Sequence, residues 1–308
     1  MTGMEQYVIG MDGGGTKTAV ALLDLSGREL ARYAAGPMNY NGVPAETVEE
    51  SIRQSLREIG REHPLAGCAA LCVASAGAGN PEIRARLKQD VRACGYAARL
   101  LVAGDEQAAL AGAIDGPRGM ILIAGTGSIC CGRNELGERR RSGGYGHLID
   151  DVGSGYAIGR DILSAAVRAA DGRNGPTVLT ELLCARAGLG GTEEIVRFVY
   201  GAHTAKSDIA SLAKLLPEAC RQGDGTALRI VEKSARGLAE LPMPVARELG
   251  LTDAKLALCG SILQKDPFIR ETFRKRLREA LPGVECAEPL RDAAAGAALM
   301  ALEAYRGQ

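Results

Sequence analysis

The sequence predicts an α/β protein built of two domains, each with layered strands and helices. Three observations lead to this prediction. Glycine-rich loops join pairs of strand-like segments in two places, at Tyr7–Asp24 and at Gly119–Arg133. Around these loops, buried-strand patterns alternate with stretches in which apolar residues recur at helical spacing. The chain of 308 residues is also long enough for two hydrophobic cores.

The first predicted domain opens with strands. Val8 to Asp12 has the pattern of a buried strand, and Thr16 to Leu23 follows at hairpin spacing. A turn at Ser26 and Gly27 leads into a third strand, residues 28–33. The other elements expected in this domain are, in order, a helix at 46–59, a strand at 69–74, a helix at 81–94, a strand at 98–102 and a helix at 107–113.

The second predicted domain repeats the opening pattern and then becomes mostly helical. Its strand, loop and second strand run from Gly119 to Arg133, and a turn at 134–137 leads into a third, polar strand. The elements expected after them are helices at 155–170, 177–187, 208–221 and 225–249, a strand at 255–259 and a final helix at 291–305.

Asp115, Gly116 and Pro117 form a turn signal, so we expect domains at 1–115 and 116–292. Whether the C-terminal helix, residues 293–308, completes the first domain stays open.

The loop Asp12–Lys17 (DGGGTK) predicts phosphate binding. Tandem glycines let backbone N–H groups approach a phosphate, and the hydroxyls of Thr16 and Thr18 add donors. Asp12 could hold Mg²⁺ through water, and Lys17 could offset phosphate charge. The spacing matches neither a Walker A loop nor a dinucleotide fingerprint, and a strand rather than a helix follows. The residues predicted to bind nucleotide here are Asp12, Gly13, Gly14, Gly15, Thr16 and Lys17.

The first loop could be an ordinary glycine-rich hairpin without a ligand. A second glycine-threonine loop with the same arrangement argues against that alternative. Gly125, Thr126, Gly127 and Ser128 follow an apolar strand and precede another strand, as in the first loop. Two such units facing each other could hold a polyphosphate such as ATP from both sides.

Asp105 is the candidate catalytic base. It follows the buried strand at 98–102 and precedes a helix, and in open α/β sheets such strand ends face the ligand crevice. A carboxylate there could accept the proton of a substrate hydroxyl that attacks a γ-phosphorus. The alternative is that Asp105 only caps the helix. Glu106 is adjacent, but its side chain should point elsewhere.

The segment Gly143–Tyr156 concentrates glycines, two carboxylates, a histidine and an aromatic ring before a helix. Loops of this richness are seldom only connectors. Asp151 could bind a pair of sugar hydroxyls, and Tyr145 could stack on a pyranose face. Asp150 or Asp151 could instead cap the helix that begins near Gly155. His147 is equally suited to a structural role, and the three histidines have no metal-binding spacing.

Composition indicates a soluble cytoplasmic protein with no nucleic-acid or membrane partner. Acidic and basic residues number 37 each, so the formal net charge is zero. We find no basic leader with an apolar core and no uncharged run long enough to cross a membrane. Nine cysteines are too few for a disulfide scaffold in a chain of this length.

These motifs, in this order, resemble the N-acetylglucosamine kinases of the BadF/BadG/BcrA/BcrD ATPase family, within the actin/hsp70/sugar kinase superfamily. The resemblance rests on the segments at 12–18, 125–128, 143–147 and 151–156 and spans nearly the whole chain. It implies two ribonuclease H-like domains with ATP between them, and a homodimer. It also implies that Asp105 is the base, that Thr126 contacts the nucleotide and that Gly260 and Ser261 form the turn beneath the adenine. The sugar ligands that it implies are Asn39, Ser75, Gly77, Tyr145 and Asp151.

The chain departs from that family in ways that bear on the sugar. Tyr145 stands where tryptophan is common, and Val152 stands where glutamate is common. Glucosamine, N-acetylglucosamine and N-acetylmuramic acid therefore all remain candidates. The related sugar kinases and repressors with a cysteine-rich zinc segment are disfavoured, because no cysteine spacing here reproduces it.

The resulting hypothesis is an ATP- and Mg²⁺-dependent kinase that phosphorylates an amino sugar, with the 6-hydroxyl of N-acetylglucosamine as the expected acceptor. The alternative is an ATP-driven iron–sulfur activator of an acyl-CoA dehydratase or reductase. Cys130 and Cys131 argue against it, because neighbours on a strand point to opposite faces. A sugar sensor without turnover is a third possibility, although no DNA-binding helix pair precedes the first strand.

Overall fold

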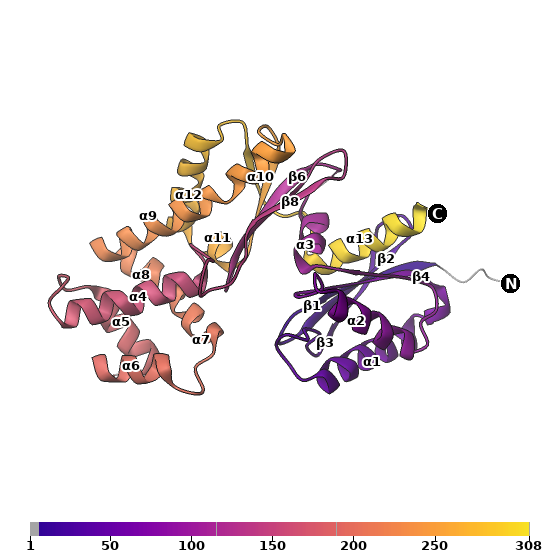
Figure 1. The fold of residues 1–308 in the computed structure, drawn as a ribbon, viewed down its shortest axis with the longest axis horizontal. Helices are drawn as coiled ribbons and strands as arrows, with labels where there is room; N and C mark the ends of the chain where they lie inside the picture. Colours follow the sequence, from indigo (N-terminus) through magenta and orange to yellow (C-terminus); the bar gives the residue numbers. More distant parts are fainter. Residues whose placement is uncertain (1–5, 115, 189, 308) are drawn as a thin grey trace. The chain divides into compact units, whose positions relative to one another are not determined.

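The computed structural model describes residues 6–114, 116–188 and 190–307. The chain forms two compact units, each with a five-stranded mixed sheet (Figure 1). Unit 1 combines the residues before Gly116 with the segment from Pro289 onward, and unit 2 is Gly116–Glu288. The chain thus leaves unit 1 once and returns to it.

The sheet of unit 1 has the strand order β3-β2-β1-β4-β5. The meander β1–β2–β3 is antiparallel, whereas β4 and β5 run parallel to β1. The register pairs Gly13 with Ser75 and Ala74 with Ala103, so the carboxyl ends of the three parallel strands lie at one edge. The strands are β1 Tyr7–Gly13, β2 Thr18–Asp24, β3 Glu29–Ala35, β4 Cys68–Ser75 and β5 Arg99–Ala103.

Helices cover both faces of this sheet (Figure 1). The apolar stripes of α1 (Ala45–Glu62) and α2 (Pro81–Ala93) pack on one face, against side chains such as Ile9 and Met11. A short 3₁₀ turn, Leu65–Gly67, precedes β4. On the other face lie α3 (Asp105–Ala113) and α13 (Ala293–Arg306), which contact Val8 and Cys72. Strand residues alternate between the two faces, as the period of two requires.

Small residues let α13 approach the sheet and α3 closely. A Cβ atom added to Gly10 of β1 would lie 2.1 Å from the backbone nitrogen of Ala298. A Cβ atom added to Gly296 would lie 1.9 Å from the carbonyl oxygen of Ala108. Glycine is therefore required at both positions for backbone contact.

The sheet of unit 2 has the order β10-β9-β6-β7-β8, with an antiparallel meander β6–β7–β8 and with β9 and β10 parallel to β6. It repeats the plan of unit 1. The strands are β6 Gly119–Ala124, β7 Ser128–Arg133, β8 Arg139–Gly143, β9 Lys255–Cys259 and β10 Glu285–Ala287.

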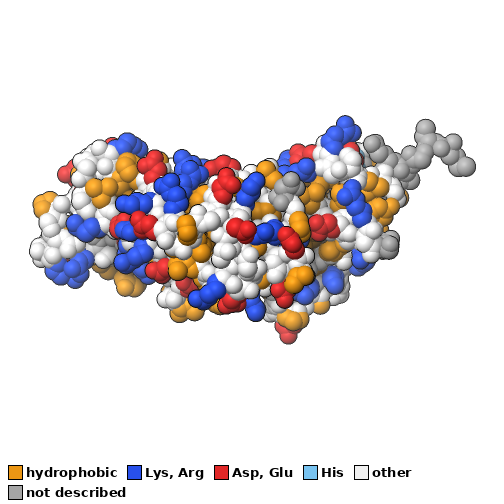
Figure 2. Space-filling model, turned by 90° about the horizontal axis from the view of Figure 1, so that it is seen from above, with side chains coloured by type: hydrophobic (Ala, Val, Ile, Leu, Met, Phe, Trp, Pro, Cys, Tyr) orange, Lys and Arg blue, Asp and Glu red, His pale blue; other side chains and the backbone are white. Residues whose placement is uncertain are grey.

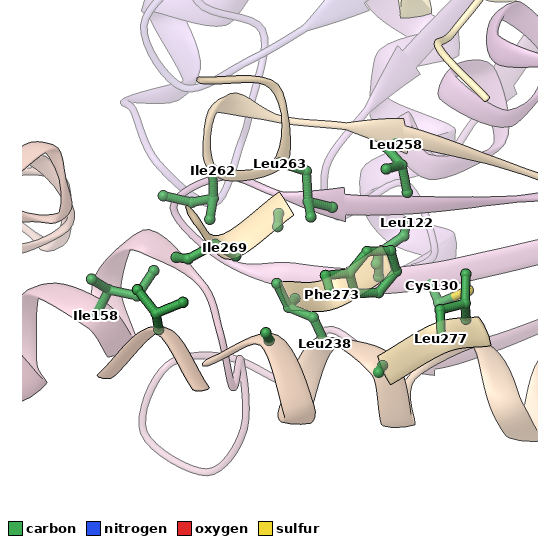
Figure 3. Close-up of a cluster of buried hydrophobic side chains, with 14 of the residues drawn as sticks. Leu122, Cys130, Ile158, Leu238, Leu258, Ile262, Leu263, Ile269, Phe273 and Leu277 are labelled. Carbon is green, nitrogen blue, oxygen red and sulfur yellow. The ribbon is translucent and has the colours of Figure 1, made fainter. Parts of the chain in front are cut away.

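The core of unit 2 forms where its helices pack against one face of this sheet. Phe273 lies among aliphatic side chains of the strands and helices (Figure 3). The others labelled there are Leu122, Cys130, Ile158, Leu238, Leu258, Ile262, Leu263, Ile269 and Leu277. The helices are α4 Gly155–Ala170, α5 Val178–Ala187, α6 Thr192–Tyr200, α7 Lys206–Ser211, α8 Leu216–Arg221, α9 Gly225–Glu240, α10 Pro242–Leu249, α11 Ser261–Lys265 and α12 Pro267–Ala280, with a 3₁₀ turn at Leu212–Leu215.

Several boundaries differ from the sequence expectation. The predicted helix 225–249 is two helices that meet at Leu241, because Pro242 has no N–H for an internal helix bond. The predicted helix 208–221 begins at Lys206 and is broken by the 3₁₀ turn before Pro217. The sequence reasoning also missed α6, α12 and β10. The last helix begins at Ala293 and belongs to unit 1, and Asp115 of the expected border lies outside the described residues.

The surface matches the neutral composition. On the face shown in Figure 2, acidic and basic side chains are interspersed rather than gathered into fields of one sign. In the described part of the chain, no helix has the length and apolar character needed to cross a membrane.

Candidate active site

Three predicted residues of unit 1 lie at the carboxyl edge of its sheet. Asp12 is near the end of β1, Ser75 ends β4, and Asp105 follows β5 after Gly104. These three strands are parallel neighbours, so their ends converge on one edge. In open α/β sheets this edge is where ligands bind.

The loop after β1 is held by its own backbone and by the segment before α1. The Gly14 amide donates to the Lys17 carbonyl at 3.0 Å, and the Met38 amide donates to the Gly14 carbonyl at 3.1 Å. Gly15, Thr16 and Lys17 are exposed, and a Cβ atom on Gly15 would meet no atom within 4 Å. This part of the loop therefore has room for an approaching phosphate.

One expected donor has a structural role instead. The Thr18 hydroxyl is buried and donates to the Gly36 carbonyl at 2.8 Å. The expectation that it would be a phosphate donor is therefore wrong. Thr16 remains as the exposed hydroxyl of this loop.

Asp12 lies in an electrostatically unfavourable place for a negative charge. Burial raises the pKa of its carboxyl group to about 6, and the nearby charges of Asp105 and Asp292 add to the rise. A carboxylate whose neighbours are also acidic gains from a cation close by. That Asp12 holds Mg²⁺ through water stays a prediction.

Asp292 was missed by sequence reasoning. It is the N-cap residue of α13, where its carboxylate accepts from the Ala295 amide at 3.0 Å, and it also pairs with Arg32. Burial works against its charge, but the hydrogen bond from Arg32 and the helix amides lower the pKa. An aspartate just before an alanine-rich helical run is an N-cap signal that could have located it.

Asp105 occupies the first turn of α3 with an exposed side chain. The N-cap position belongs to Gly104, and no side chain caps this helix. The alternative that Asp105 only caps the helix is therefore wrong. Its carboxylate lies on the first turn of the helix, near the positive end of the helix dipole.

The expected sugar ligands of unit 1 gather around the segment before α1. Ser75 is buried, and its hydroxyl donates to the Met38 carbonyl at 2.8 Å. The Asn39 side-chain oxygen accepts from the Asn41 amide at 2.9 Å. Gly77 has a φ of +87°, and a Cβ atom there would lie 2.1 Å from the Asn41 side-chain nitrogen. Asn39 and Gly77 therefore both lie beside Asn41, whereas Ser75 lies beneath the same segment with its hydroxyl bonded to the backbone.

In unit 2, the loop Gly125–Ser128 is tied to the start of α4. The Gly155 amide donates to the Gly125 carbonyl at 2.7 Å. The Ser128 hydroxyl donates to the Val152 carbonyl at 2.9 Å, whereas Thr126 is exposed. Thr126 thus presents the available hydroxyl of this loop.

Gly260 and Ser261 follow β9 and lie beside the end of β6, the strand that precedes the loop Gly125–Ser128. Gly260 has a φ of +85°, and a Cβ atom there would lie 2.4 Å from the Ala124 carbonyl oxygen. Ser261 is the exposed first residue of α11. Within unit 2, Gly260 is therefore held against the last residue of β6, immediately before the loop.

Asp151 and Tyr145 sit differently on unit 2. Asp151 is buried, and its carboxylate lies against Gly127 and Ser128. Tyr145 is exposed, with the Arg141 guanidinium 4.9 Å from its ring centroid. Its amide donates to Asp150 at 3.3 Å, and a cavity of about 390 Å³ lies beside Tyr145, Asp150 and Val152. The rings of His147 and Tyr156 pack edge to face with their centroids 4.5 Å apart, in keeping with a structural role for His147.

The cysteines are buried or partly buried as free thiols. Cys130 and Cys131 are neighbours on β7, and only Cys130 belongs to the main core of unit 2. Burial raises the pKa of the Cys72 thiol to about 12, which favours the neutral form. Among the described residues, no group of three or more potential ligands is arranged to hold a metal ion.

Comparison with known proteins identifies the family. The sequence profile of the BadF/BadG/BcrA/BcrD ATPase family matches residues 9–301. The chain belongs to this family. It is 35% identical to an N-acetylmuramic acid/N-acetylglucosamine kinase of Clostridium acetobutylicum, with 96% of this chain and 98% of that protein covered. It is 29% identical to an N-acetyl-D-glucosamine kinase of Dictyostelium discoideum, with 98% of this chain and 99% of that protein covered.

Solved structures of proteins named as sugar kinases share the fold. A Chromobacterium violaceum protein, named as a candidate N-acetylglucosamine kinase, superimposes with a TM-score of 0.76 at 26% identity, over 96% of this chain and 98% of that one. A ROK family glucokinase from Streptomyces griseus superimposes with a TM-score of 0.56 at 20% identity, over 96% of this chain and 99% of that one. The predicted α/β, actin-like sugar kinase fold with two domains is confirmed.

Proposed function

We propose that this protein is an ATP-dependent kinase that phosphorylates a hydroxyl of an amino sugar, with the 6-hydroxyl of N-acetylglucosamine or a close relative as acceptor. The observation that carries the proposal is the carboxyl edge of the unit 1 sheet. There the parallel strands bring Asp12, Ser75 and Asp105 to one edge, next to a glycine loop with open space. Relatives that are named as sugar kinases, and that align with nearly the whole chain, support the same activity.

The nucleotide would be bound by backbone groups of the two glycine loops. Residues Gly13 to Lys17 and Gly125 to Ser128 supply amides, the exposed hydroxyls of Thr16 and Thr126, and the Lys17 ammonium. The turn at Gly260 and Ser261 would lie beneath the adenine. Asp12 would hold Mg²⁺ through water, and the bound ion would neutralise charge that develops on the transferring phosphoryl group.

Asp105 would be the catalytic base. Its exposed carboxylate would accept the proton of the sugar hydroxyl while that oxygen forms a bond to the γ-phosphorus of ATP. The bond from the γ-phosphorus to the bridging β,γ-oxygen breaks, and ADP leaves. Because this chemistry depends mainly on position and electrostatics, a carboxylate on the first turn of α3 is well suited to it.

The sugar would contact Asn39, Ser75 and Gly77 of unit 1 and Tyr145 and Asp151 of unit 2. Hydrogen bonds of the segment before α1 would hold Asn39 and Ser75 in place. Tyr145 offers a ring face, and Tyr145 and Val152 vary from the family pattern where the sugar substituent would be recognised. We infer that these two positions take part in the choice among amino sugars.

The test is ADP release with Mg²⁺-ATP against glucosamine, N-acetylglucosamine, N-acetylmuramic acid and plain hexoses. We expect release that depends on an amino sugar. Asp105→Asn should lower kcat by about 10²- to 10⁴-fold while the ATP dissociation constant, from calorimetry, changes little. The matched control is Glu106→Gln, the next residue on α3, which should keep most of the turnover.

Two results would contradict the proposal. Equal losses of turnover and ATP affinity in Asp105→Asn would remove Asp105 as the base. ATP hydrolysis indifferent to every sugar would instead point to an ATPase such as the iron–sulfur activator, and visible absorbance of anaerobically purified protein would then be measured.

We also infer, from the family resemblance, that the protein is a homodimer. Its other partners would be small molecules rather than nucleic acid or membranes. Light scattering coupled to size-exclusion chromatography tests the oligomeric state. A mass of one chain at micromolar concentration would contradict it.

A further inference from the structure

Asp151 is a buried side chain of unit 2 with an unusual backbone conformation. Its side chain is 4% exposed, and its φ of 62° is the only left-handed value of a non-glycine residue in the described ranges. The Ser154 amide donates to the Asp151 carbonyl at 3.1 Å, which closes a turn into α4. A residue stays in this conformation only where its surroundings hold it firmly.

Two donors hold the Asp151 carboxylate. The Ser128 amide lies 3.4 Å from Oδ1, which is a long contact for a hydrogen bond. The Lys206 ammonium lies 3.3 Å from Oδ2 and forms an ion pair. Among the residues that the structure describes, Lys206 is the only cationic side chain paired with Asp151. Burying a charge is costly unless the charge is paired and hydrogen-bonded, and Lys206 provides the counter-charge of Asp151.

The carboxylate also abuts the loop Gly125–Ser128. A Cβ atom on Gly127 would lie 2.9 Å from Asp151 Oδ2. A negative charge at this place repels phosphate oxygens that approach the same loop, unless a cation offsets it. Lys206 does so from the start of α7, and its side chain is 36% exposed.

We propose that Lys206 is a positioning residue that acts through Asp151. Its ammonium fixes the Asp151 carboxylate for the sugar and offsets the negative charge beside the phosphate loop. The inference rests on the proposed function, because it takes Asp151 as a sugar ligand and Gly125–Ser128 as a nucleotide loop. Lys206 lies 55 residues after Asp151 and belongs to no motif of the sequence, so tertiary structure alone pairs the two.

The test is a double-mutant cycle. Lys206→Met should raise the KM for the amino sugar and the dissociation constant for ATP by about tenfold each, with a smaller change in kcat. Lys206→Arg keeps the charge and should restore most of both. The double variant Asp151→Asn with Lys206→Met should be no worse than Asp151→Asn alone, because the neutral amide no longer needs the cation. Lys214→Met, an exposed lysine eight residues further on, is the matched control and should resemble wild type.

Thermal unfolding midpoints of all variants separate this role from a loss of folding. Two results would overturn the inference: additive effects of the two substitutions in the cycle, or a Lys206→Met protein with unchanged KM and ATP affinity. The proposed function would still stand in either case if the wild type showed sugar-dependent turnover. A wild type without sugar-dependent turnover would instead overturn the proposed function. Calorimetric binding of ATP still decides the inference in that case, since Lys206→Met should weaken it and Lys206→Arg should not.

Discussion

At the residue scale, the acidic side chains Asp12, Asp105 and Asp292 of unit 1 make the stability of the fold depend on pH. Because burial, Asp105 and Asp292 raise the pKa of Asp12 to about 6 from a reference of 3.8, the folded state binds more protons than the unfolded state between these values. The ionised, buried carboxyl group thus destabilises the ligand-free fold at neutral pH. This penalty falls as the pH is lowered through 6 and is gone below 3.8.

We therefore expect Asp12→Asn to be more stable than wild type at pH 7.5, by up to about 3 kcal/mol for a shift of this size. The difference in free energy of unfolding should shrink towards pH 4. Urea unfolding of ligand-free protein across this range measures it. Glu303→Gln, an exposed position on α13, is the control and should show no such trend. A difference that grows as the pH falls would contradict the assignment.

At the scale of elements, α3 and α13 pack so closely at Gly296 that there is no space for a Cβ atom at this position. Its Cβ atom would collide with the Ala108 carbonyl oxygen and lie 2.5 Å from the Gly112 amide nitrogen. Gly296→Ala should therefore lower the free energy of unfolding by about 1–3 kcal/mol or more, despite the better helix propensity of alanine.

Gly60→Ala in α1 is the matched control for this prediction. It makes the same change within a helix, but its Cβ atom would meet only the Leu65 side chain at 3.8 Å. It should raise stability by up to about 1 kcal/mol. Chemical unfolding of the two variants should give opposite signs, and equal signs would show that packing does not limit α13.

At the scale of the whole molecule, unit 1 is discontinuous and unit 2 is a continuous stretch of chain. The face of the unit 1 sheet that bears Val8, Leu23 and Cys72 is covered by α13. A chain that ends at Glu288 would expose this apolar face, so unit 1 should lose its cooperative fold while residues 116–288 keep theirs.

Hydrogen exchange with mass spectrometry tests this prediction. Peptides of β1, β2 and β4 should lose protection in the shortened chain, whereas peptides of β6 and α9 should keep it. A chain that lacks only residues 307 and 308 should behave as wild type. Retained protection in β1 of the chain ending at Glu288 would show that unit 1 folds without α13.

The sequence by itself determined the two glycine loops, their place between strands and the carboxylate after β5, because these follow from local patterns of period two, glycine and charge. It also indicated the α/β class and the family. It misplaced helix ends at Pro242 and around Pro217, although a proline, which has no N–H for an internal helix bond, signals such an end.

Tertiary structure alone decided the contacts between residues far apart in sequence. It assigned α13 to unit 1, brought Asp292 near Asp12 and paired Lys206 with Asp151. It also directed the Thr18 hydroxyl to the backbone of Gly36 instead of towards a ligand. Periodicity reports which face of an element is buried, but not which other element covers that face, so these pairings required the folded chain.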